Sequence, residues 1–155
     1  MKRIAIAAVL LITLVGVARA GFDEGFFAYN QGDYATAEKE FRLLAVQGDA
    51  DAQAKLGFMY HIGLGIQQDY AKAVKWYRKA AEQGNVNAQT SLGIMYLNGY
   101  GATQDYVQAH FWSNLAASQD NDAARKYLDV IAKLMTPADI SKAQAIAREW
   151  LEKHQ

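Results

Sequence analysis

Hydrophobic side chains recur three or four positions apart along most of the chain, the spacing that places them on one face of an α-helix. Glycine and aspartate interrupt this pattern at short intervals, as expected where one helix ends and the next begins. The pattern predicts an all-α chain with about eight helices, over residues 22–31, 34–47, 51–62, 70–83, 87–98, 106–118, 122–134 and 137–152.

The same pattern contains an internal repeat. The segment 52–84 matches the segment 88–120 at an offset of 36 residues. The matching pairs include Ala52 and Ala88, Gln53 and Gln89, Leu56 and Leu92, Gly57 and Gly93, Tyr60 and Tyr96, and Trp76 and Trp112. Carried in both directions, this register predicts three repeats, over about residues 22–48, 51–84 and 87–120, and then capping helices over 122–152.

Each repeat has the features of two antiparallel helices. Gly63 and Gly65 suit the tight connection between them, and Asp69 precedes the second helix where an N-cap belongs. Gly57 lies on the first helix, where its lack of a side chain permits a close approach of the second. One such pair cannot bury both of its faces, so the repeats are expected to stack into a single elongated core.

The repeated residues resemble the Sel-one-like repeat family, a relative of the tetratricopeptide repeats. Its pattern, A-x-x-x-L-G-x-x-Y-x-x-G-x-G followed by D-x-x-x-A-x-x-W-x-x-x-A-A, is read from Ala52 to Gly84 and again from Ala88 to Ala117. The segment Gly25 to Gly48 is more similar to a tetratricopeptide repeat. The resemblance implies a right-handed α-solenoid of stacked antiparallel helix pairs. It also implies a scaffold or adaptor function, with exported bacterial members associated with the cell envelope.

The start of the chain has the features of a secretory signal. Lys2 and Arg3 precede an apolar run from Ile4 to Ala18, and Ala18-Arg19-Ala20 supplies a signal peptidase site. The run is about fifteen residues, shorter than the roughly 20 needed to span a bilayer. We therefore expect residues 1–20 to be cleaved, leaving residues 21–155 as a single periplasmic or secreted domain without a stable membrane span.

Composition narrows the possible chemistry. Removing Lys2, Arg3 and Arg19 from the 16 basic residues leaves 13 against 16 acidic ones, a balance that does not favour nucleic acid as a partner. The chain has no cysteine, which excludes thiolate metal sites and a cysteine nucleophile. Its three histidines, His61, His110 and His154, form no metal-binding motif. We expect no catalytic residue, cofactor or metal, and hence not an enzyme.

A set of large side chains is expected to line an open groove. In two-helix solenoids the first helix of each unit lines the concave face. Positions one and four residues after Gly25, Gly57 and Gly93, with their equivalents in the cap, should point into this groove. They are Phe26, Tyr29, Phe58, His61, Ile94, Leu97, Val130 and Lys133.

These residues predict a partner-binding site. A run of large apolar groups along an open surface usually marks such a site, so we expect an exported scaffold that binds a segment of another protein, in the cell envelope. The alternatives are a cell-wall peptide- or glycan-binding protein or small enzyme using the same surface, and a structural array that dimerises through it.

Overall fold

The computed structural model describes residues 20–154, and every regular element in that range is a helix. A first helix covers residues 20–31. It is followed by α2 (Tyr34–Gln47), α3 (Ala50–Ile62), α4 (Tyr70–Glu82), α5 (Val86–Asn98), α6 (Tyr106–Ser118), α7 (Asp122–Ala132) and α8 (Pro137–His154). The all-α prediction is confirmed, with helix ends within two residues of those expected. All but the last residue of the predicted signal peptide lies outside the described residues.

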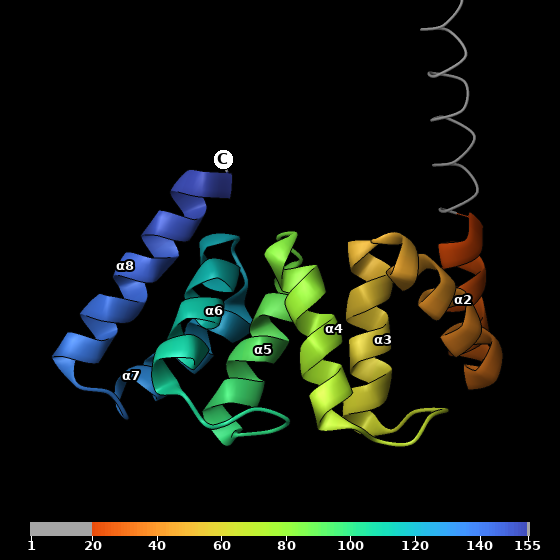
Figure 1. Ribbon diagram of the computed structural model, residues 1–155, viewed down its shortest axis with the longest axis horizontal. Coiled ribbons are helices and arrows are strands. Elements are labelled where there is room, and N and C mark those ends of the chain that lie inside the picture. The colour runs from red at the N-terminus through yellow and green to blue at the C-terminus, as the bar shows by residue number, and fades with distance from the viewer. Residues whose placement is uncertain (1–19, 155) are drawn as a thin grey trace, which may run out of the picture.

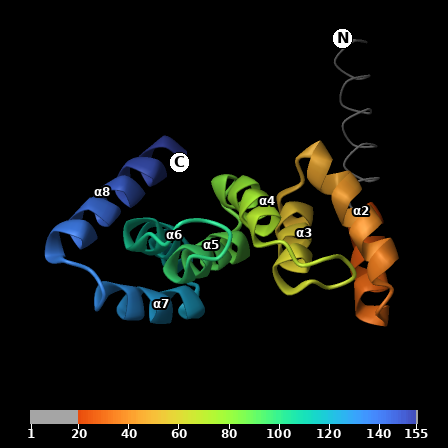
Figure 2. The same cartoon turned by 60° about the horizontal axis from the view of Figure 1, so that its bottom comes forward.

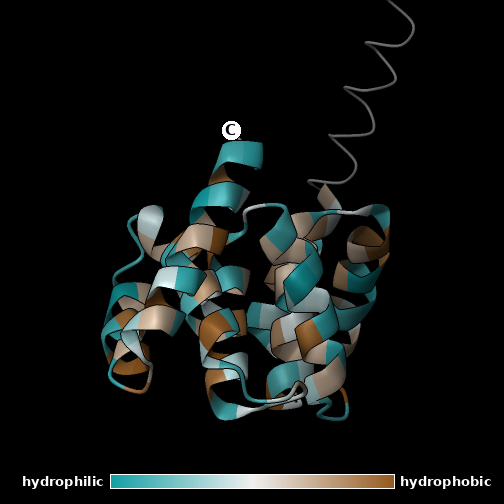
Figure 3. Ribbon diagram, turned by 60° about the vertical axis from the view of Figure 1, so that its left-hand side comes forward, coloured by the Kyte–Doolittle hydropathy of each residue, from teal (hydrophilic) through white to brown (hydrophobic). Residues whose placement is uncertain are grey.

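The helices stand side by side in a row, from α2 at one end to α8 at the other (Figure 1). Turned by 60°, the row is seen to bend, with α2 and α8 at its two ends (Figure 2). Hydrophobic and hydrophilic residues alternate in short stretches along each helix (Figure 3), as expected when a helix buries one face and exposes the other. This arrangement is the α-solenoid that the repeat predicts.

Each of the helices α2 to α7 begins with a side-chain cap. The carboxylate of Asp69 accepts a hydrogen bond from the backbone N–H of Lys72, and that of Asp105 from Gln108, both at 2.9 Å. Asp33, Asp49, Asn85 and Asn121 cap the other four helices in the same way. At the opposite end of α3, Gly63 has a φ of 73°, a left-handed conformation that glycine adopts without strain. Local sequence therefore defines where these helices start and stop.

Within each repeat the two helices meet at a glycine of the first one. A Cβ added at Gly57 would lie 2.8 Å from Cδ1 of Tyr77 on α4, and one added at Gly25 would lie 3.0 Å from Cε1 of Phe41 on α2. At Gly93 an added Cβ would overlap Ser113 of α6. The side chain opposite thus occupies the volume that a first-helix side chain would otherwise fill.

Between repeats, polar side chains connect the helices in the same register. The Gln53 amide donates to the carbonyl of Ala45 at 3.0 Å, and Gln89 donates to that of Ala81 at 3.1 Å. Both carbonyls belong to the last turns of helices, where each also accepts a hydrogen bond from the backbone N–H of the glycine that follows, Gly48 or Gly84. The guanidinium of Arg42 donates to the Tyr60 hydroxyl at 2.8 Å, and Arg78 and Tyr96 repeat this pair 36 residues later.

The last helix, α8, packs against α6, the second helix of the preceding repeat. Exposed Lys75 and Lys79 on α4 are replaced at the equivalent positions of α6 by Phe111 and Leu115, which are buried. Helix α8 packs against α6, so this additional apolar face is covered. The replacement of two lysines by two apolar residues therefore marks where the repeat array ends.

Helix α6 also buries a histidine. His110 is 5% exposed, its Nδ1 has no hydrogen-bond partner among the described residues, and burial lowers its pKa. The equivalent position in the preceding repeat is Val74, which is also buried. An apolar residue can therefore occupy this position in the repeat.

A first prediction concerns the contact at Gly57. Gly57→Val would place a branched side chain against the Tyr77 ring, and should lower the free energy of unfolding by about 1–3 kcal/mol through overpacking. Denaturant unfolding would measure the change. Lys75→Val is the control, because it adds the same residue to an exposed helical position. Equal stability of the two variants would contradict this packing.

A second prediction concerns pH. Unfolded histidine titrates near 6.5, whereas folded His110 takes up its proton only at lower pH. As the pH falls below about 6.5 the unfolded chain binds more protons, so stability should decrease. His110→Val should reduce this decrease between pH 7 and pH 5, as measured by thermal unfolding. Parallel curves for the two proteins would show that His110 does not contribute.

Candidate functional site

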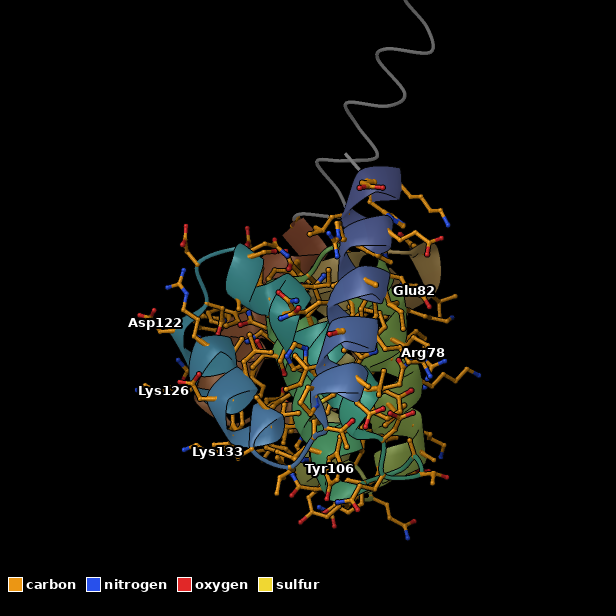
Figure 4. The ribbon with its side chains drawn as sticks, turned by 90° about the vertical axis from the view of Figure 1, so that its left-hand side faces the viewer. Arg78, Glu82, Tyr106, Asp122, Lys126 and Lys133 are labelled. Carbon is orange, nitrogen blue, oxygen red and sulfur yellow. The ribbon has the colours of Figure 1, made fainter. Side chains whose placement is uncertain are left out.

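A hollow of about 460 Å³ lies on the side of the molecule formed by the first helices of the repeats. Figure 4 shows the two sides: Asp122 and Lys126 of α7 lie on one, and Arg78 and Glu82 of α4 lie on the other. The residues that line the hollow are Phe22, Tyr29, Asp51, Ala54, Lys55, Phe58, Tyr77, Asn85, Asn87, Thr90, Ser91, Asn121 and Ala123.

The repeat register explains why these residues meet. Asp51, Ala54, Lys55 and Phe58 are spaced three, four and seven positions along α3, and so share one face. Adding 36 to the first three gives residues 87, 90 and 91 of α5, which also line the hollow, and adding 72 to 51 gives residue 123 of α7. The hollow is therefore formed by the same helical face in successive units.

One end of the hollow is aromatic. The rings of Phe22 and Phe26 stack with centroids 6.4 Å apart, and Phe22 also packs 5.5 Å from Phe41. The ammonium of Lys55 lies 5.0 Å from the ring centroid of Phe26 and 5.6 Å from that of Tyr29. Distances of this size give a favourable cation–π interaction. Helix 20–31 thus supplies rings that position a cation from α3.

The other end of the hollow carries amides. The Asn85 side chain uses its oxygen to cap α5 and its nitrogen to donate to Asp51 Oδ1 at 2.7 Å. Asn121 uses its oxygen to cap α7, and its nitrogen makes no hydrogen bond within residues 20–154. Asn87 is exposed between them. Amide nitrogens and oxygens at this end can therefore both donate to and accept from a bound group.

Tyr77 forms part of the wall of the hollow. Because Gly57 has no side chain, the Tyr77 ring lies directly against α3. Tyr77 is 2% exposed, and its hydroxyl has no hydrogen-bond partner among the described residues. Burial raises the pKa of Tyr77 to about 12, with a smaller opposing effect from the Ser91 side chain, so the Tyr77 hydroxyl is neutral near pH 7.

Of the predicted groove residues, three lie at the hollow. Tyr29 and Phe58 line it, and Phe26 borders it through its contact with Lys55. Phe26 is 42% exposed and Phe58 38% exposed, so both rings are accessible. The structure therefore brings together the predicted aromatic residues of the first two units.

The other five predicted residues lie elsewhere. His61 packs edge-on against Tyr70 and Tyr77, with centroids 5.7 and 6.2 Å away, and burial lowers its pKa. Ile94 and Leu97 are half-buried on α5. Val130 is exposed on α7, and Lys133 is the exposed residue at its C-terminal end. None of the five lines the hollow.

Sequence reasoning missed the polar residues of the hollow, chiefly Asp51, Lys55, Asn87 and Ser91. The prediction counted forward from the glycine of each first helix, toward its C-terminal end. Most of the residues that α3, α5 and α7 contribute to the hollow instead lie in the N-terminal halves of these helices. Counting back three, four and seven positions from Phe58 would have reached Lys55, Ala54 and Asp51.

Two further properties of the described residues bear on the site. Within residues 20–154, no three histidines, aspartates or glutamates come together in a group able to hold a metal ion. In the same range no helix combines the length and the apolar character needed to cross a membrane.

The solved structures that are similar to this chain include two repeat proteins. One is a protective antigen present in uropathogenic Escherichia coli strains that displays an SLR fold, with a TM-score of 0.84 and 32% sequence identity. The match covers 88% of this chain and 30% of the antigen, so this chain spans less than a third of that relative. The other is the Sel1 repeat protein from Oxalobacter formigenes, with a TM-score of 0.66 and 34% identity over 77% of this chain and 96% of that protein.

The sequence itself matches the family model of the Sel1 repeat over residues 50–85 and 86–128. The comparison with curated proteins gives no match. The two matched segments begin with α3 and α5, the first helices of the second and third repeats, and the glycine contacts at Gly57 and Gly93 lie within them. This chain belongs to the Sel1 repeat family.

Proposed function

We propose that this protein is an exported scaffold that binds an extended segment of another protein in the hollow. Sel1 repeats generally mediate protein–protein interactions. The hollow supports this proposal because it presents aromatic rings at one end and amide groups at the other. A peptide segment needs both, because its side chains gain from apolar contact and its backbone needs donors and acceptors.

The size of the hollow supports the same proposal. Its volume of about 460 Å³ lies within the range of pockets that bury small ligands or a few side chains. Phe22, Tyr29 and Phe58 provide rings of the type that anchor protein interfaces. Because these rings come from two different units, a segment lying across them would run along the stack.

We propose binding without catalysis. Among the lining residues the titratable side chains are Asp51, Lys55 and the two tyrosines Tyr29 and Tyr77. Asp51 accepts a hydrogen bond from Asn85, and the pKa of Tyr77 is about 12. A general base or acid works best with a pKa near the ambient pH, and the lining of the hollow presents no histidine to meet this need.

A third prediction tests the site. The mature chain, residues 21–155, would capture its partner from an envelope extract, and the dissociation constant of the purified partner would then be measured. Phe58→Ala should weaken binding by about 2 kcal/mol, near thirtyfold. Because Phe58 is partly exposed, the stability loss should stay well below the 3–5 kcal/mol typical of an emptied core phenylalanine site.

Val130→Ala is the matched control for Phe58→Ala. Val130 occupies the equivalent register position on α7 and is exposed, but lies outside the hollow. Its truncation should leave the dissociation constant unchanged. Equal effects of the two variants would mean that the partner does not bind in the hollow, and a glycan in place of a protein would mean that the ligand class is wrong.

A fourth prediction tests export. The charged start, the short apolar run and Ala18-Arg19-Ala20 support cleavage after Ala20. N-terminal sequencing of the protein purified from its native cells should therefore begin at Gly21. A soluble protein that retains Met1 would contradict the proposed export.

A further inference from the structure

We propose that Lys55 recognises an acidic side chain, so that the partner segment carries an aspartate or glutamate beside a large apolar residue. This inference rests on the proposed function, because it names the chemistry of the segment that the hollow binds. The spacing of Asp51 and Lys55 on α3 favours an ion pair that the structure does not form.

Asp51 and Lys55 are one helical turn apart on α3. An acidic residue four positions before a lysine can form a stabilising ion pair on the helix surface. Within residues 20–154, no carboxylate lies within the 4.0 Å of the Lys55 ammonium that defines such a pair, whereas Lys72, Lys153, Arg42 and Arg125 all have one. The two charges that line the hollow are therefore held apart.

Each of these charges has another partner instead. Asp51 accepts the 2.7 Å hydrogen bond from Asn85 of the next unit. The Lys55 ammonium lies over the rings of Phe26 and Tyr29. A ring face attracts the charge but accepts no strong hydrogen bond, so the N–H groups of Lys55 remain able to donate to a ligand.

The surroundings of Lys55 strengthen its attraction for an anion. Its side chain is half-buried, and the equivalent position in α5 is the neutral Ser91. Lys55 is the one cation among the residues that line the hollow, and Asp51 is the one carboxylate. A charge positioned in advance and partly removed from water attracts an opposite charge more strongly than a freely exposed one does.

The position of Lys55 indicates that it binds an acidic side chain of the partner segment rather than the C-terminal carboxylate of that segment. Beyond Lys55, the exposed ring of Phe26 continues the apolar surface along helix 20–31. A segment that contacts both Phe58 and Phe26 must pass Lys55 rather than end there. Its acidic group would then meet the ammonium while neighbouring apolar side chains contact the rings.

A fifth prediction tests this inference with a displayed library of random heptapeptides, flanked by linker at both ends. The immobilised mature chain should select peptides with Asp or Glu next to an aromatic or large aliphatic residue. Lys55→Glu should lose these peptides and select Lys or Arg at the same place. For a synthetic copy of one selected peptide, Lys55→Gln should weaken binding about tenfold, measured by fluorescence anisotropy.

Lys79 offers a matched control on the opposite side of the molecule. Its ammonium lies 4.7 Å from the ring centroid of Trp76 on α4, outside the hollow. Lys79→Glu should select the same peptides as the wild-type chain, and Lys79→Gln should bind the synthetic peptide unchanged. Thermal unfolding of each variant would verify that it is folded.

The outcomes separate this inference from the proposed function. If selected peptides lose affinity with Phe58→Ala but not with Lys55→Glu, the hollow binds peptide and the role of Lys55 is wrong. Peptides that bind only with a free C-terminus would also overturn the acidic side-chain proposal. If no selected peptide depends on Phe58, the proposed function itself fails.

Discussion

The close approach of two helices at a glycine determines much of this molecule. At Gly57 the ring of Tyr77 occupies the volume that a first-helix side chain would fill, and Gly25 and Gly93 make the same contact with Phe41 and Ser113. Without this approach the second helix would lie farther out, and the polar links between repeats would lose their register. Packing of this density leaves little tolerance for added volume.

In the second repeat, the side chain that packs against the glycine, Tyr77, also forms part of the wall of the hollow. At Tyr77 the side chain is long enough to reach the wall of the hollow, where its hydroxyl lacks a partner among the described residues. In the next repeat the same position is Ser113, which is buried and does not line the hollow. The repeat thus keeps one backbone arrangement while a single position changes what the surface presents.

Regular stacking gives each unit the same polar connections. The Gln53 and Gln89 amides donate to last-turn carbonyls of the preceding repeat, and the pairs of Arg42 with Tyr60 and Arg78 with Tyr96 add further links between successive repeats. These bonds direct each first helix against the preceding second helix. The hollow follows from this order, because identical helical faces are brought side by side at each step.

The sequence alone determined the helices, the 36-residue register and the solenoid, because caps, glycines and apolar spacing act locally and recur. It also identified Tyr29 and Phe58, which line the hollow. The repeat register also predicted His61, Ile94, Leu97, Val130 and Lys133 as groove residues, and none of them lines the hollow, because the register does not show which residues of each first helix face it. Only the tertiary structure decided that, because the bend and spacing of the stack depend on packing between units. The tertiary structure also determines the separation of Lys55 from Asp51. Lys55 lies over the rings of Phe26 and Tyr29 and Asp51 is hydrogen-bonded to Asn85, and these three partners come from outside α3.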